Sequence, residues 1–212
     1  MTTRTILAAA CILAIVSSVH ADLTVIGTAT YDGGEYNLIY EPAQSLVWLD
    51  YTREQDTWQN QMDWATGLGG SLTVNLDPLY TTTIDWTTGW RLPATDESQA
   101  NLDGAFGYAG PDETGYHDYR YGYNMVNSEM GHLSYVSLGN LGAFTTDGTQ
   151  REVGDYGLKN TGPFDHLVSN WDYYSQTTYS PDEDAHRAWG FHFRTGNQFF
   201  HNKAVNELYA IA

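Results

Sequence analysis

Three adjacent carboxylates form the clearest candidate for metal binding in the sequence. Asp182, Glu183 and Asp184 follow Pro181 in a loop between two expected strands, and Asn202 stands at the end of a neighbouring strand. Ca²⁺ takes about six to eight oxygen ligands, which carboxylates and amide carbonyls supply. These four oxygen-bearing residues therefore predict a Ca²⁺ site. We expect no cofactor to be required, so Ca²⁺ would be an optional ligand. A solvated acidic turn is the simpler alternative, because full coordination needs further ligands.

Tyrosines form a second candidate site, this time for a sugar. Residues 103–124 are rich in Gly and Tyr and lack helical or strand periodicity, which predicts a long loop. Aromatic rings suit the apolar face of a pyranose, and the Tyr hydroxyl adds a hydrogen bond. We expect this loop to bind a glycan or a surface protein through Tyr116, Tyr119, Tyr121 and Tyr123. In the alternative interpretation the rings pack back on the domain and hold the loop in place.

Histidines offer two further metal-binding patterns, and both are incomplete. Glu129 and His132 share one face of an expected helix, a spacing that binds metal in di-iron bundles when it occurs twice. Here it occurs once, so Glu129 is better explained by the helix dipole and His132 as a surface or half-buried residue. His192 and His201 could face each other across a hairpin, but a catalytic Zn²⁺ site needs a third protein ligand. Exposed polar positions on a sheet are the better interpretation of these two residues.

Motifs for covalent or phosphoryl chemistry are absent from the sequence. It has no Gly-x-Ser-x-Gly elbow and no phosphate-binding Gly loop, and Cys11 is its single cysteine. We therefore expect that the protein is not an enzyme. The 26 acidic residues leave a paired-carboxylate enzyme acting on polysaccharide as a third alternative.

Charge and the first residues predict where the protein works. The 212-residue chain has a formal net charge of −17, which disfavours nucleic acid and anionic membranes as partners. Arg4, the apolar run 6–16 and the small-residue site ending at Ala21 predict a signal peptide over residues 1–21. We expect a secreted or cell-surface protein with no membrane span in the mature chain. Residues 22–212 are expected to form a single domain, in which 22–45 is an N-terminal hairpin or extension.

The elements that must position these residues follow from local patterns. Asp32-Gly33 predicts a hairpin turn between the strands of residues 23–40. Apolar spacing predicts one helix from Asp56 or Thr57 to about Leu68, with Trp58, Met62 and Ala65 on its buried side, and a second from Ser128 to 139–140. Short strands are expected at 45–50, 171–177, 188–194, 198–201 and 208–212. Two main helices with short antiparallel strands predict an α+β fold.

Several blocks of the chain, in this order, resemble the DUF1566 family, also called the C-terminal domain family of the collagen-like adhesins. They are Val47-Trp48-Leu49-Asp50, 58–64, Trp90-Arg91-Leu92-Pro93, 128–133, Leu138-Gly139-Asn140, Gly162-Pro163-Phe164 and the terminal strands. The blocks from 128 to 164 look like the branch in exported bacterial proteins with a PEP-CTERM sorting tail, and the resemblance covers residues 46–212.

The resemblance implies a C-type-lectin-like domain, distantly similar to formylglycine-generating enzymes, and implies glycan or surface adhesion. The adhesin relatives are associated with sulfated polysaccharides, which the acidic charge of this chain does not favour. The sequence has no sorting tail after Ala212, so we expect either a truncated chain or a freely secreted member.

Together these observations predict an exported, non-enzymatic binding or adhesion domain that recognises a neutral or weakly charged glycan or a cell surface, with Ca²⁺ as an optional aid. The alternative is a self-associating extracellular matrix or filament subunit, which would form homo-oligomers through its aromatic loops and strand edges.

Overall fold

The structure is a computed structural model that describes residues 23–81, 89–99, 107–108, 121–179 and 185–212. The expected signal peptide, residues 1–21, lies outside these ranges. Within them, no helix is long and apolar enough to span a membrane.

One sheet is built around the hairpin that the sequence predicts. Asp32 and Gly33 both have positive φ, 47° and 77°, as the tight hairpin turn requires. Tyr31 therefore pairs with Gly34, and the strands on either side run antiparallel. The sheet has the order β3-β2-β1-β5. Its strands are β1 (Thr24–Tyr31), β2 (Gly34–Glu41), β3 (Leu46–Leu49) and β5 (Thr73–Leu76).

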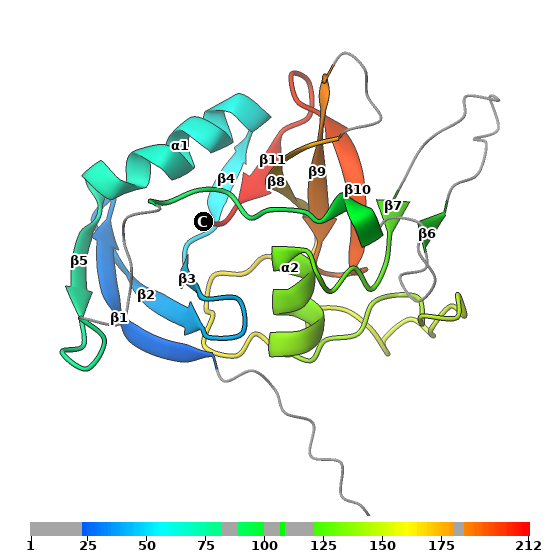
Figure 1. Ribbon diagram of the computed structural model, residues 1–212, viewed down its shortest axis with the longest axis horizontal. Helices are drawn as coiled ribbons and strands as arrows, with labels where there is room; N and C mark the ends of the chain where they lie inside the picture. Colours follow the sequence, from blue (N-terminus) through cyan, green and yellow to red (C-terminus); the bar gives the residue numbers. More distant parts are fainter. Residues whose placement is uncertain (1–22, 82–88, 100–106, 109–120, 180–184) are drawn as a thin grey trace, which may run out of the picture.

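The second sheet contains the four strands expected in the last part of the chain. Its order among the described strands is β4-β11-β8-β9-β10-β7-β6, and β11 runs parallel to β8 while the other pairs are antiparallel. The strands are β4 (Arg53–Asp56), β6 (Gly107–Tyr108), β7 (Tyr121–Gly122), β8 (Asp172–Thr178), β9 (Arg187–His192), β10 (Asn197–Asn202) and β11 (Leu208–Ala210). Figure 1 shows the two sheets on opposite sides of the molecule.

The first expected helix is confirmed as α1 (Trp58–Ser71), which reaches from β4 to β5 (Figure 1). Its fully buried residues are Gln61, Ala65 and Leu68, and Trp58 and Met62 are partly buried against the same core cluster, so the predicted buried side is confirmed and also includes the polar Gln61. The Gln61 amide donates hydrogen bonds to the carbonyls of Glu54 and Leu208, at 2.8 and 2.7 Å. A buried amide is tolerated where it finds such partners.

The second expected helix changes its winding after one turn. It begins as α2 (Glu129–His132) and continues as the π-helix η3 (Leu133–Ser137). The described chain has one further short helix, the 3₁₀ helix η2 (Glu97–Gln99).

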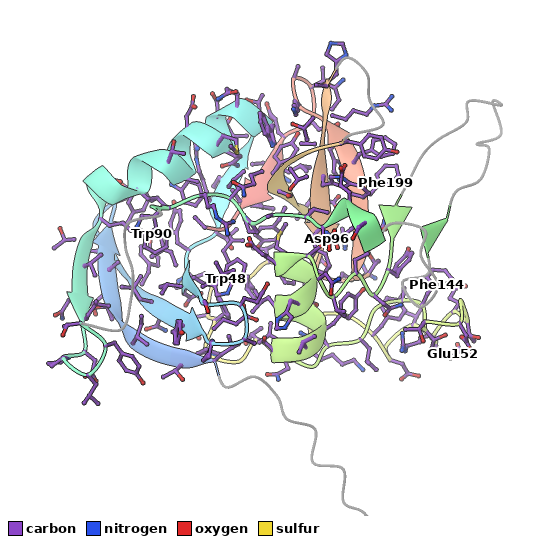
Figure 2. The ribbon with its side chains drawn as sticks, viewed as in Figure 1. Trp48, Trp90, Asp96, Phe144, Glu152 and Phe199 are labelled. Carbon is purple, nitrogen blue, oxygen red and sulfur yellow. The ribbon has the colours of Figure 1, made fainter. Side chains whose placement is uncertain are left out.

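The core joins the two sheets into one body. Buried apolar residues of β1, β2 and β3 pack in the same cluster as residues of β8, β9 and β11. The members of that cluster include Ile26, Leu38, Leu49, Tyr174, Ala188 and Ala210. A second cluster places Trp48 with Met130 and Leu133 of the helical segment, and Figure 2 shows Trp48 near the centre of the molecule.

The prediction of a C-type-lectin-like α+β fold with two main helices is wrong. Two β-sheets dominate the described chain, and α1 is its only helix longer than five residues. The pattern from Ser128 was counted as a main helix, yet only four of its residues are α-helical. The hairpin expected within residues 22–45 is present as β1 and β2, which form the two middle strands of the first sheet.

Candidate functional site

Four aromatic side chains from four segments meet beside the first sheet. We call Tyr31, Tyr36, Tyr51 and Trp64 the aromatic platform. The ring centroids of Tyr31 and Tyr36 lie 5.1 and 4.9 Å from that of Tyr51, and both contacts are edge-to-face. The ring centroid of Trp64, in α1, lies 6.0 Å from that of Tyr51. All four residues are half-buried, and their side chains pack against the main hydrophobic core.

The hairpin geometry explains why two of these rings share a face. Tyr31 pairs with Gly34 across the turn, and Tyr36 follows Gly34 by two residues, so the side chains point to the same side of the sheet. Gly34 also makes room, because a Cβ atom there would lie 2.5 Å from the Tyr36 hydroxyl oxygen. The residues between the two tyrosines therefore set the arrangement of the first half of the platform.

The platform contains one hydroxyl that accepts a hydrogen bond within it and one phenol that is neutral. Trp64 donates its Nε1 hydrogen to the Tyr31 hydroxyl at 3.2 Å. Burial, with smaller contributions from Tyr31, Tyr36 and the Asp32 carboxylate, raises the pKa of Tyr51 above its ordinary value of 10.0. The Tyr51 phenol is therefore neutral at physiological pH and can both donate and accept a hydrogen bond.

A histidine held by a buried carboxylate extends the platform. The His166 ring packs edge-to-face against Tyr36 at 5.2 Å. Asp50 is buried and accepts hydrogen bonds from the backbone N–H groups of Asp165 and His166 and from His166 Nδ1, the last at 3.2 Å. The imidazole is thereby oriented with Nε2 directed away from Asp50, and the side chain is 47% exposed. Such a ring can contact a ligand lying on Tyr36.

A single cation contacts the platform in the described part of the chain. The Arg53 guanidinium lies 5.7 Å from the Trp64 ring. Its Nη2 pairs with Asp56 Oδ2 at 3.0 Å, and its Nη1 donates to the Asn60 carbonyl at 2.5 Å. The charge of Arg53 is thus already shared with protein partners.

A second polar constellation surrounds Glu41, which is fully buried. Its Oε2 accepts hydrogen bonds from Trp48 Nε1 and Gln44 Nε2, each at 2.7 Å. Its Oε1 accepts from Ser137 Oγ and lies 2.8 Å from His132 Nδ1. One carboxylate therefore ties together the β2–β3 turn, β3 and the helical segment.

The π-helix is what allows His132 and Ser137 to share one oxygen. Residues five apart in an α-helix point about 140° away from each other, since each residue turns the helix by about 100°. The π turn, closed by the bond from Leu138 N to the Leu133 carbonyl at 2.9 Å, brings residue i+5 back beneath residue i. Both side chains consequently reach Glu41 Oε1.

Glu41, His132 and Ser137 do not have the geometry of a hydrolytic triad. In a triad the serine hydroxyl bonds to the imidazole nitrogen opposite the one held by the carboxylate. Here Ser137 Oγ lies 3.3 Å from Nδ1, the same nitrogen that Glu41 holds, and Ser137 donates to the carboxylate itself. The imidazole therefore cannot take the Ser137 proton on Nε2 as the general base of a triad does, and these three residues form a structural hydrogen-bonded group.

The tyrosines predicted as a sugar site are only partly described. Tyr116 and Tyr119 lie outside the described residues, and Tyr121 lies in β7. Tyr123 is half-buried, with its ring centroid 4.8 Å from that of Phe144. This ring packs back on the domain, as the alternative interpretation of the loop expects.

The predicted Ca²⁺ site is described at one of its four residues. Asp182, Glu183 and Asp184 lie outside the described residues. Asn202 Oδ1 accepts hydrogen bonds from the backbone N–H groups of Ala204 and Val205, at 2.9 and 3.3 Å, and so stabilises its own turn. Across the ranges that the structure describes, no three acidic, His or Cys residues are grouped to hold a metal ion. The Ca²⁺ site stays a prediction.

The histidine patterns resolve into separate contacts. Glu129 forms a two-pronged ion pair with Arg91, at 2.6 and 2.7 Å, whereas His132 turns to Glu41. His201 packs with 15% of its side chain exposed, 3.8 Å from Asp172. Burial, opposed by Asp172, lowers the pKa of His201 below its ordinary value of 6.5.

Sequence reasoning missed the aromatic platform, although one of its signals was present. Two tyrosines that flank an Asp-Gly turn at positions 31 and 36 must share a face once the hairpin forms. Tyr51, Trp64 and His166 carry no comparable signal, because they approach the hairpin only through the tertiary fold.

Comparison of the chain with models of protein families, with curated proteins and with solved structures found no match.

Proposed function

We propose that this is an exported, non-enzymatic carbohydrate-binding protein and that the aromatic platform is its binding site. The observation that carries the proposal is the convergence of Tyr31, Tyr36, Tyr51 and Trp64, whose centroids lie 4.9 to 6.0 Å from that of Tyr51. Aromatic side chains are ordinarily buried in a core or used in recognition, and a group of half-buried rings that carry hydroxyls favours recognition.

The chemistry of the site matches that of a sugar ring. A pyranose presents an apolar C–H face, which the aromatic rings can cover, and a rim of hydroxyls. The neutral Tyr51 phenol and the oriented His166 imidazole provide hydrogen-bonding groups for that rim. The rings are held by the sheet and by α1, so binding costs little side-chain ordering.

The resemblance to the DUF1566 family leads to the same expectation of glycan or surface adhesion. The proposal of export rests on the leader predicted over residues 1–21.

The test is a glycan array followed by calorimetry on the mature chain, run with Ca²⁺ and with chelator. We expect Tyr51→Ala to weaken binding at least about tenfold, about 1.4 kcal/mol, and Tyr51→Phe to keep most of the affinity. Tyr123→Ala is the matched control, because it removes a tyrosine from the other candidate surface. Binding that survives Tyr51→Ala but is lost in Tyr123→Ala would move the site to the loop. Absence of any glycan binding would end the proposal.

A second candidate function is self-association through β5, which ends the first sheet in the order of the described strands. The strand carries no charge or proline, and Val74 is 40% exposed. Edge strands of this kind pair with other chains unless they are protected. We expect light scattering to show concentration-dependent oligomers that Val74→Lys abolishes; a monomer at all concentrations would exclude this function.

A further inference from the structure

The charges around the aromatic platform point to the class of sugar that it binds, an inference that rests on the proposed function. Asp32 lies in the turn between Tyr31 and Tyr36, and its side chain is exposed. Its carboxylate is close enough to act electrostatically on the Tyr51 phenol. Because Asp32 directly follows Tyr31 in the turn, a negative charge thus stands beside the ring cluster.

Arg53, the cation that contacts the platform, is already paired with other groups and does not neutralise Asp32. Arg53 is held by Asp56 at 3.0 Å and by the Asn60 carbonyl at 2.5 Å. A uronic acid or a sulfated sugar that entered the platform would approach the Asp32 carboxylate, and the Arg53 charge that could balance it is already shared with Asp56. With a formal net charge of −17, the whole chain also repels a polyanion.

The oriented histidine adds a hydrogen-bond acceptor. Asp50 accepts from the N–H groups around it, so the tautomer of His166 that fits this contact has its hydrogen on Nδ1, 3.2 Å from Asp50 Oδ2. Nε2 then carries the lone pair and can accept a hydrogen bond. A ligand that lies on Tyr36, 5.2 Å from the His166 ring centroid, therefore meets an acceptor at that edge.

Aromatic faces themselves favour cations. The faces of Tyr and Trp rings carry negative potential, and an ammonium group within about 6 Å of a ring is attracted to it. The aromatic rings and the Asp32 carboxylate thus favour a positively charged ligand, and His166 Nε2 favours one that donates a hydrogen bond. An apolar pyranose face with an ammonium substituent meets all of these conditions.

We propose that the aromatic platform selects sugars that carry a free, protonated amino group, such as the glucosamine units of a de-N-acetylated amino-sugar polymer. The rings cover the pyranose face, Asp32 faces the ammonium group, and His166 Nε2 accepts from a hydroxyl or ammonium hydrogen.

The experiment compares oligomers of equal length and linkage that differ in charge: glucosamine, N-acetylglucosamine and glucose oligomers, with a glucuronic acid oligomer as the anionic member. Calorimetry on the mature chain is expected to show the glucosamine oligomer binding about fivefold more tightly than the neutral ones, as one exposed ion pair allows. This preference should shrink as salt is raised, because salt screens exposed charges.

Asp32→Asn tests the carboxylate without disturbing the turn. Asp32 has φ of 47°, a conformation that Asn also adopts readily, so the hairpin is preserved. Glu152→Gln removes one charge far from the site, at the end of the molecule opposite β1 and β5 in Figure 2. We expect Asp32→Asn to remove the preference for glucosamine, and Glu152→Gln to retain it.

The outcomes separate this inference from the function on which it rests. Equal binding of glucosamine and neutral oligomers would overturn the amino-sugar preference and leave the carbohydrate-binding proposal standing. Equal loss in Asp32→Asn and Glu152→Gln would attribute the preference to net charge and overturn the assignment to this site. If none of the oligomers binds, and the glycan array is also empty, both proposals are wrong.

Discussion

Replacement of the buried Glu41 should reveal how much stability its hydrogen-bonded group contributes. Glu41 is fully buried and accepts from Trp48 Nε1 and Gln44 Nε2 at 2.7 Å each, from Ser137 Oγ, and from His132 Nδ1 at 2.8 Å. Glu41→Gln keeps the shape and loses the charge. Glu41→Ala removes the acceptor altogether.

The two variants should differ in stability because the groups that donate hydrogen bonds to Glu41 have different alternative acceptors. After Glu41→Ala, the Trp48 N–H is left buried without an acceptor, a loss of about 1–3 kcal/mol, and a cavity opens beside it. Ser137 can turn to His132 Nδ1, 3.3 Å away, and Gln44 keeps its bond to the Glu129 carbonyl. We therefore expect Glu41→Ala to lower the free energy of unfolding by about 3–5 kcal/mol.

Glu41→Gln should cost less, about 1–2 kcal/mol. Its amide oxygen can face Trp48 and Gln44, while its NH₂ group can donate to His132 Nδ1 if the imidazole hydrogen moves to Nε2. That change of tautomer is itself measurable from the ¹⁵N chemical shifts of the imidazole.

The assay is urea unfolding followed by tryptophan fluorescence, with the slope of free energy against urea compared between variants. Glu152→Ala, on an exposed residue, is the control and should change stability by less than about 0.5 kcal/mol. A loss below about 1 kcal/mol in Glu41→Ala would refute the claim that this carboxylate ties the sheet to the π-helix.

Two further predictions concern ionisable groups elsewhere in the fold. The pKa of His201 is lowered in the folded state, mainly by burial and further by His192, so below its unfolded value of 6.5 the unfolded chain binds the proton more readily. The free energy of unfolding should therefore fall as the pH drops below about 6.5, and urea midpoints of His201→Phe should show a smaller fall; equal pH dependence would contradict this. Arg91→Lys replaces a two-pronged contact with Glu129 by a single point charge and should cost about 1 kcal/mol in the same unfolding assay, whereas an unchanged midpoint would show that the pair does not hold the segment.

Local chemistry explains the elements that sequence patterns predicted correctly. The Asp32-Gly33 turn was predicted because few residue pairs adopt positive φ, and the structure has both in that conformation. The strands near the end of the chain and the helix α1 also follow from short-range patterns of apolar residues and turn residues.

Local sequence patterns gave incomplete predictions where a contact with a residue distant in the sequence determines the structure. The buried side of α1 includes the polar Gln61, since its amide reaches carbonyls of Glu54 and Leu208, and Leu208 lies 147 residues away. The segment from Ser128 winds into a π-helix, in which His132 and Ser137 both reach Glu41 of β2. The expectation of two main helices is wrong because only four residues of this segment are α-helical.

Residue types and their neighbours along the chain were enough to predict an acidic, aromatic-rich chain with a single cysteine and its individual hairpins, because each of those properties depends on composition or on residues a few positions apart. Only the tertiary structure brought Tyr51, Trp64 and His166 to the hairpin of Tyr31 and Tyr36. Contacts between segments so far apart depend on how the sheets and α1 pack, and no local pattern encodes that packing.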